Sequence, residues 1–129
     1  MKGLDTPVLL AILHDAPASR ALLKGLRGEE LATTEINLFE LTALAASGPA
    51  AQREHREAAL SRLRRRVTVL PVTAESVRDA GRLLKGRNPP VGYRALIWGT
   101  LSAAGCGEWI TTKAYAPPKP GLPFKLRLV

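Results

Sequence analysis

Two carboxylates in apolar surroundings are the residues of this sequence best placed to do chemistry. Asp5 lies within Leu4-Asp5-Thr6-Pro7-Val8-Leu9-Leu10, and Glu40 lies within Ile36-Asn37-Leu38-Phe39-Glu40-Leu41. Each is an acid at the edge of an element that should be buried, a position that favours catalysis or metal binding. The later segments that could supply partner acids carry Arg94 and Lys113 instead. Whether the protein is an enzyme depends on what these two cations do.

Helix-start and turn signals divide the chain into alternating strands and helices that must position these residues. Thr6 as N-cap followed by Pro7 predicts a helix start, and the β-branched run 67–71 predicts a strand. The predicted strands cover residues 3–5, 30–33, 67–71, 109–112 and 126–129. The predicted helices cover residues 6–13, 18–26, 34–46, 52–66, 73–84 and 93–104. The Pro- and Gly-rich stretch 86–92 is predicted to be a loop and not a domain boundary.

This alternation predicts an α/β fold. We expect a single domain over residues 1–129, with a central parallel sheet of four to five short strands and helices on both faces. In such a sheet the functional crevice lies beyond the carboxyl ends of the strands. Asp5 follows the first strand, Thr111 to Lys113 follow the fourth, and Glu40 can lean back toward the same edge from its helix. Glu108 precedes the fourth strand and should lie at the opposite edge.

Composition narrows the class of protein. The single cysteine, Cys106, excludes an internal disulfide and fits a reducing cytoplasm. No apolar run approaches the roughly 20 residues of a membrane span, so we expect a cytoplasmic protein that does not enter membranes. The net charge of +8 comes largely from 13 arginines and favours contact with nucleic-acid phosphates. The arginine-rich segment 52–66 also contains glutamates, and is equally consistent with a solvated helix face.

Four segments carry a resemblance to a known family. The opening Leu4 to Leu10 resembles the first motif of PIN-domain ribonucleases, hydrophobic-Asp-Thr/Ser-x-hydrophobic, and Glu40 matches their second acid. Residues 94–101, Arg-Ala-Leu-Ile-Trp-Gly-Thr-Leu, are similar to the family's Asp-Ala-Leu-Ile-Ala-Ala-Thr-Ala. Gly105 and then Ile-Thr-Thr-Lys at 110–113 are similar to its glycine turn and Val-Thr-x-Asp. The length and layout resemble the VapC-type toxins of bacterial and archaeal toxin-antitoxin pairs.

The resemblance implies a metal-dependent ribonuclease. In that mechanism carboxylates hold Mg²⁺ or Mn²⁺, and the metal activates water for in-line attack on a phosphodiester. This sequence departs from the pattern at two places. The third acid aligns with Arg94, or is deleted just after it if Gly92-Tyr93-Arg94 is the retained loop, and the last acid aligns with Lys113. At an effective dielectric of ~20, unlike charges about 4 Å apart attract by about 4 kcal/mol, so these cations would neutralise the acids and repel a metal ion. Arg94 can form a bidentate pair with Asp5 or Glu40, whereas Lys113 would act as a point charge.

Three functions follow as hypotheses. The first is a VapC-type domain with a degenerate metal site that binds RNA, or acts in a toxin-antitoxin pair, without cleavage and without a cofactor. The second is an active Mg²⁺- or Mn²⁺-dependent endoribonuclease, in which Asp5 and Glu40 are catalytic and hold one weakly bound ion. The third is a protein-interaction subunit without RNA binding, which pairs with itself or with an antitoxin-like peptide. The resemblance implies a homodimer. The candidate binding residues are Thr6, Arg94, Thr111 and Lys113.

Several single residues have weaker interpretations. Phe39, Tyr93 and Trp98 are candidate interface or stacking groups. Such side chains more often lie in the core, so a core position is the first expectation for each. Val77 is expected on the inward face of its helix. His14 and His55 lie too far apart in sequence to suggest a motif.

Overall fold

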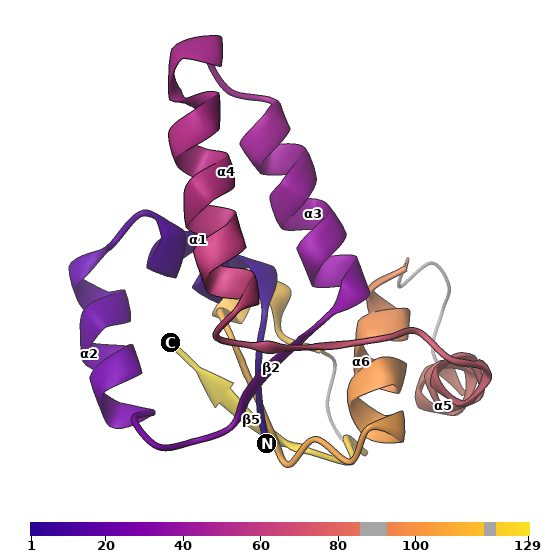
Figure 1. The fold of residues 1–129 in the computed structure, drawn as a ribbon. Helices are drawn as coiled ribbons and strands as arrows, with labels where there is room; N and C mark the ends of the chain where they lie inside the picture. The colour runs from indigo at the N-terminus through magenta and orange to yellow at the C-terminus, as the bar shows by residue number, and fades with distance from the viewer. Residues whose placement is uncertain (86–92, 118–120) are drawn as a thin grey trace.

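A parallel sheet of five strands runs through the computed structural model, which describes residues 1–85, 93–117 and 121–129 (Figure 1). Its spatial order is β3-β2-β1-β4-β5, and each neighbouring pair is parallel. The chain therefore leaves the central strand β1 toward β2 and β3 first, and later crosses to β4 and β5 on the other side. This reversal opens a crevice at the carboxyl ends of β1 and β4. The strands are β1 (Lys2–Leu4), β2 (Leu31–Thr34), β3 (Thr68–Leu70), β4 (Glu108–Thr111) and β5 (Lys125–Leu128).

Helices cover both faces of the sheet. They are α1 (Thr6–Leu13), α2 (Pro17–Gly25), α3 (Glu35–Ala46), α4 (Ala50–Arg64), α5 (Ala74–Leu84) and α6 (Arg94–Ala103), with a 3-10 turn, η1 (Lys113–Tyr115). Successive residues of a strand point to opposite faces, so Ile110 packs with α1 to α4 whereas Trp109 packs with α5 and α6. Figure 1 shows α3 and α4 side by side as an antiparallel pair that rises above the sheet.

The predicted architecture is confirmed, and each predicted strand and helix overlaps an observed one. The start of α1 differs by one residue from the prediction. Asp5, not Thr6, is the N-cap, because its Oδ1 accepts the backbone N–H of Thr6 at 2.8 Å. The turn η1 was not predicted, and the loop predicted at 86–92 lies outside the described residues.

Three apolar side chains lie elsewhere than expected. Val77 on α5 is 55% exposed, because α5 buries Ser76 and Ala80 against α6 instead. Phe39 is 71% exposed and Tyr93 is 55% exposed, so a core position for them was the wrong expectation. Trp98, at 2% exposed, is in the core as expected.

Lys2 forms two ion pairs at the edge of the sheet opposite the crevice. Lys2 Nζ lies 3.3 Å from a carboxylate oxygen of Glu29 and 3.3 Å from one of Glu108. These two partners raise the pKa of the Lys2 amine, chiefly through their hydrogen bonds. Glu108 therefore lies at the amino end of β4, as predicted, and cannot join Asp5.

Within residues 1–85, 93–117 and 121–129, no helix is long and apolar enough to cross a membrane.

Helices α5 and α6 cross in close contact at Gly99. A Cβ atom at Gly99 would lie 2.2 Å from the backbone oxygen of Ser76 and 2.6 Å from the backbone nitrogen of Ala80. Both obstacles are backbone atoms, which cannot rotate away as a flexible side chain can. The crossing therefore requires glycine at this position.

Substitution of Gly99 by alanine should test this contact. We expect Gly99→Ala to lower the free energy of unfolding by about 2 kcal/mol, because overpacking forces the two helices apart. Urea denaturation followed by circular dichroism measures the change. The control is Gly81→Ala on α5, where an added Cβ meets nothing within 4 Å. That variant should gain roughly 0.5–1 kcal/mol from the better helix propensity of alanine. Equal effects of the two variants would contradict the proposed close crossing.

Candidate functional site

Asp5 is the centre of the polar cluster in the crevice. Its side chain is fully buried, yet its two oxygens accept four hydrogen bonds. Oδ1 accepts from the backbone N–H of Thr6 at 2.8 Å and from Nδ2 of Asn37 at 2.9 Å. Oδ2 accepts from the Arg94 guanidinium at 2.5 Å and from the Thr111 hydroxyl at 2.6 Å. An ionised carboxylate has about four lone-pair sites, so these donors use its whole accepting capacity.

Asp5 and two of its donors, Asn37 and Thr111, lie at or just after the ends of three neighbouring strands. Asp5 directly follows β1, Thr111 is the last residue of β4, and Asn37 lies in the first turn of the helix that follows β2. Because β2, β1 and β4 are adjacent and parallel, their carboxyl ends meet at one edge of the sheet. The predicted convergence of Asp5 and Thr111 is therefore present in the structure.

Asn37 is a member of the site that sequence reasoning missed. It is fully buried, and its amide oxygen accepts the Thr34 hydroxyl at 2.7 Å as part of the capping box of α3. Its amide nitrogen donates to Asp5 and to the Thr6 hydroxyl, at 2.9 and 3.0 Å. One side chain thus caps α3 and holds Asp5. A usable signal was present, since Asn37 and Glu40 are three residues apart and so share a helix face.

Glu40 reaches the same cluster, as predicted, through Thr6. Its Oε1 accepts the Thr6 hydroxyl at 3.1 Å and lies 4.0 Å from Nη1 of Arg94. The Glu40 side chain is 17% exposed, whereas the Asp5 side chain is fully buried. The negative charge of Glu40 is the main cause that raises the pKa of the neighbouring Tyr93 phenol.

Arg94 occupies the space between the two acids. Its Nη2 binds Asp5, and its guanidinium carbon lies 4.8 Å from the centre of the Tyr115 ring. This is the geometry of a cation–π contact, and Tyr115 was not foreseen because its turn η1 was not predicted. The Arg94 side chain is 18% exposed. The predicted contact between Arg94 and the carboxylates is therefore present, but the predicted bidentate pair is not, because one guanidinium nitrogen faces each acid.

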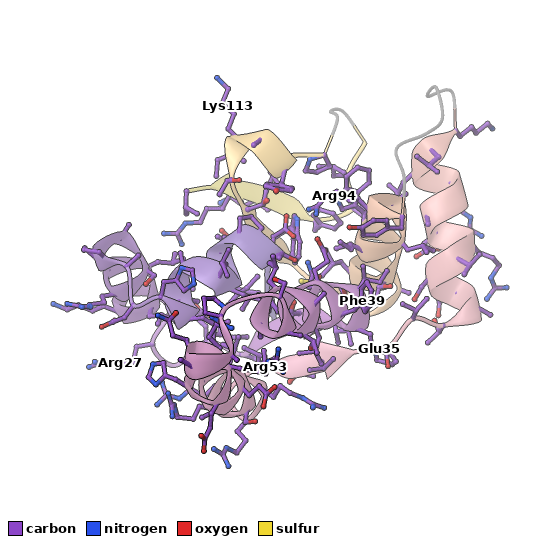
Figure 2. All side chains as sticks on the ribbon, turned by 90° about the horizontal axis from the view of Figure 1, so that it is seen from above. Arg27, Glu35, Phe39, Arg53, Arg94 and Lys113 are labelled. Atoms are coloured by element: carbon purple, nitrogen blue, oxygen red, sulfur yellow. The ribbon has the colours of Figure 1, made fainter. Side chains whose placement is uncertain are left out.

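Lys113 does not join the cluster. It is the first residue of η1, its side chain is exposed, and Figure 2 shows it extending away from Arg94 and from the body of the protein. Among the described residues, it forms no ion pair with Asp5 or Glu40. The physical reason is that β4 ends at Thr111 and the 3-10 turn that follows points residue 113 outward. Only one of the two expected cations neutralises the acids.

This arrangement fits a divalent metal ion poorly. Mg²⁺ and Mn²⁺ need free oxygen ligands and net negative charge, whereas the oxygens of Asp5 are all engaged and Arg94 already supplies a cation. In the part of the chain that the structure describes, no three His, Cys, Asp or Glu side chains are grouped to hold a metal. Asp5 and Glu40, the predicted metal ligands, are bridged by Thr6 and Arg94 instead.

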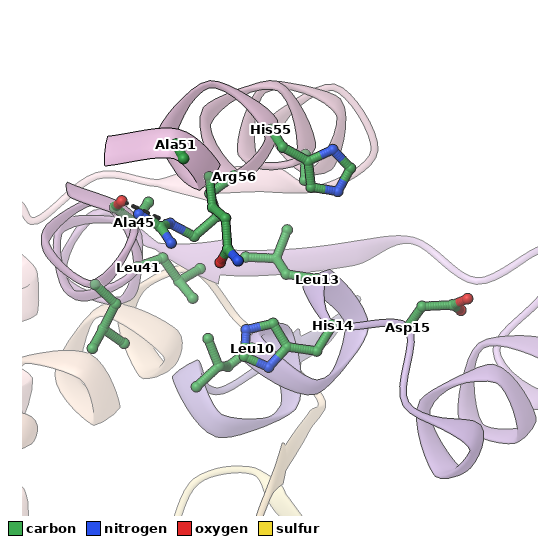
Figure 3. A pocket seen from close by; sticks show the side chains of 12 residues that line it. Leu10, Leu13, His14, Asp15, Leu41, Ala45, Ala51, His55 and Arg56 are labelled. Carbon is green, nitrogen blue, oxygen red and sulfur yellow. Dashed lines mark hydrogen bonds between the residues drawn. The ribbon is translucent and has the colours of Figure 1, made fainter. Parts of the chain in front are cut away.

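A second concave surface lies between α1, α3 and α4, away from the crevice. It is a groove of about 650 Å³ with an apolar floor that includes Leu10, Leu13 and Leu41 (Figure 3). His14 and His55 lie on its opposite walls, one at the end of α1 and one on α4. Sequence separation alone had suggested no relation between these two histidines.

Comparison with known families identifies the fold. The PIN domain family model matches residues 3–111, which is most of the chain. This chain is a PIN domain. Among curated proteins, none is significantly similar to it in sequence.

Solved structures with the same fold support the assignment. VapBC2 from Rickettsia felis, bound to a DNA fragment from its promoter, has a TM-score of 0.77 at 18% identity, covering 99% of this PIN domain and 98% of that chain. DNA-bound VapBC from Salmonella typhimurium has a TM-score of 0.74 at 19% identity, with coverages of 98% and 96%. VapBC-5 from Mycobacterium tuberculosis, a toxin-antitoxin system, has a TM-score of 0.67 at 24% identity, with coverages of 99% and 98%. At these identities the likeness shows the fold alone.

The buried pair of Asp5 and Arg94 should be strongly coupled. We expect Asp5→Asn to lower the free energy of unfolding by about 3–5 kcal/mol, because it leaves the Arg94 charge buried without its partner. The double variant Asp5→Asn/Arg94→Met should cost less than the sum of the single changes, by about 2 kcal/mol. Urea unfolding of the four proteins of this cycle measures the coupling.

An exposed pair of the same residue types provides the control. Asp15 and Arg20 form a bidentate ion pair with side chains 71% and 65% exposed. Asp15→Asn should leave the unfolding midpoint almost unchanged, since solvent screens this pair. Additive effects of the Asp5 and Arg94 substitutions would show that the buried ion pair is not formed in solution.

Proposed function

We propose that this protein is a PIN domain that binds RNA without metal-dependent cleavage. The observation that carries the proposal is the contact of Arg94 with Asp5, in the place where the family pattern has a third acid. A fixed guanidinium gives Asp5 the positive partner that a metal ion would otherwise provide. The crevice then presents hydrogen-bonding and cationic groups to a ligand, with no water-activating centre.

Charge supports a polyanionic ligand. The chain carries +8, and Lys113 is exposed beside the crevice, where it can contact a phosphate. Positive charge is also present elsewhere, since Arg27 and Arg53 lie on the side of the molecule away from Lys113 (Figure 2). Not every arginine is available, because Arg56 donates to the backbone oxygens of Ala45 and Pro49 and so ties α4 to α3. A cytoplasmic location suits such a protein.

The alternative is an active Mg²⁺- or Mn²⁺-dependent endoribonuclease. In that case Arg94 would move away from Asp5 and bind the scissile phosphate, and Asp5 and Glu40 would together hold one ion. The partial exposure of Glu40 favours this alternative, whereas the four donors on Asp5 oppose it. The two functions differ in a measurable way, because only the nuclease needs a metal ion.

Metal titration and RNA binding together test the proposal. We expect the wild-type protein to show no heat of Mn²⁺ binding and to retain single-stranded RNA equally in EDTA and in Mn²⁺, without cleavage. Arg94→Asp restores the third acid of the family pattern and should gain Mn²⁺ binding, seen as heat and as a rise in melting temperature. Arg94→Met removes the cation without adding an acid and is the matched control.

Three results would decide against this function. Tight Mn²⁺ binding by the wild-type protein that is lost in Asp5→Asn would favour the nuclease, as would RNA cleavage lost in the same variant. Failure to retain RNA at low salt would favour a protein-interaction subunit. Cleavage unaffected by Asp5→Asn would indicate a contaminating ribonuclease and would leave RNA retention as the deciding measurement.

Two apolar surfaces suggest protein partners as well. We propose that the groove between α1, α3 and α4 accepts an antitoxin-like segment with apolar side chains, because its floor is apolar. A smaller hollow of about 340 Å³ is lined by Ile36, Phe39 and Leu96 among others. We propose that a second copy of the chain covers this hollow and the exposed ring of Phe39.

A matched pair of substitutions on α3 tests the dimer. Phe39→Lys should convert a dimer to a monomer, because a lysine cannot be buried against an apolar surface without a partner. Leu44→Lys places the same charge on the same helix, but in the groove, and should leave the dimer intact. Size-exclusion chromatography with light scattering measures the mass. A wild-type monomer at all concentrations, or equal loss of the dimer in both variants, would rule out this interface.

A further inference from the structure

The turn η1 brings an exposed aromatic ring and an exposed lysine to the mouth of the crevice. Tyr115 is 44% exposed, and Lys113 is exposed on the same turn. Thr111, immediately before this segment, is buried and bonded to Asp5, so the turn is attached directly to the polar cluster. The position of η1 is therefore set by the rigid end of β4.

Tyr115 packs against Arg94. The Arg94 guanidinium lies 4.8 Å from the ring centre, and Arg94 is itself held by its ion pair with Asp5. This chain of contacts fixes the ring through a partly buried residue, while Tyr115 itself stays 44% exposed. A ring that is already immobilised loses little conformational freedom when a flat ligand stacks on it.

We propose that Tyr115 and Lys113 form a stacking site for one unpaired nucleotide, which rests on the proposed RNA-binding function. The base stacks on the accessible part of the Tyr115 ring, backed by Arg94, and Lys113 contacts an adjacent phosphate. Stacking on an aromatic side chain tolerates any base, since every base has a π-face. The site selects single strands, because the bases of a duplex are already stacked on both faces.

Binding of a fluorescein-labelled single-stranded RNA of 12 nucleotides tests the two parts separately, by anisotropy over a range of salt concentrations. Tyr115→Leu should weaken binding about tenfold without changing the salt dependence, because it removes stacking and no charge. Tyr115→Phe keeps the ring and should bind within about twofold of the wild type. Lys113→Ala should reduce the slope of log Kd against log salt by about 0.7, the value for one phosphate contact on a single strand.

Two controls separate stacking from altered folding. Lys125→Ala removes an exposed lysine at the opposite edge of the sheet and should leave the salt slope nearly unchanged. The same RNA with abasic positions should bind the wild-type protein about tenfold more weakly, and Tyr115→Leu should lose nothing further on it. This comparison uses the unaltered protein and so does not depend on the stability of a variant.

The outcomes distinguish this site from the general function. If wild-type protein binds RNA but Tyr115→Leu and abasic RNA have no effect, the stacking site is wrong and the RNA-binding function stands. If Tyr115→Phe binds as weakly as Tyr115→Leu, the hydroxyl and not the ring is responsible, and stacking is again excluded. If the wild-type protein does not bind RNA, the proposed function and this inference both fail.

Discussion

The ion pair between Asp5 and Arg94 is the interaction on which the site depends. A fully buried carboxylate is costly unless its charge is compensated, and here one cation and three neutral donors compensate it. Each donor belongs to a different part of the chain: the start of α1, the first turn of α3, the start of α6 and the end of β4. Removing the charge of Asp5 would therefore affect the junction of three strands and three helices, and not a single contact.

The same ion pair sets the electrostatics of the crevice on which the proposed function rests. Carboxylates grouped around an empty metal site repel one another until the ion binds. A guanidinium in the same space attracts the carboxylates at all times. Arg94 enters from the first turn of α6, at the position that the family pattern gives to an acid. In the function proposed above, this one residue makes the crevice self-neutralised within the same fold.

Contacts at the base of the crevice also fix the positions of the side chains at its rim. Arg94 connects the buried cluster to Tyr115, and Thr111 connects it to the turn that carries Lys113. Groups that are partly exposed at the rim are therefore positioned by contacts with buried and partly buried residues. A ligand that meets them encounters prearranged side chains, which is the condition for binding without a large entropic penalty.

The sequence by itself determined the layout of the chain and the location of the site. Its alternation of strands and helices predicted the parallel sheet, and its motif order identified the PIN pattern, because local periodicity and capping are encoded over short stretches. Asp5, Glu40, Thr111 and Arg94 were also correctly expected to meet, since the carboxyl ends of neighbouring parallel strands share one edge. What the tertiary structure alone decided was the direction of individual side chains. Asn37 turns inward through a capping box, Lys113 turns outward through an unpredicted 3-10 turn, and Tyr115 stacks on Arg94. Phe39 and Val77 face solvent for the same reason: the rotation of a helix about its axis, and the path of a turn, are set by packing between segments distant in sequence, which a local pattern does not record.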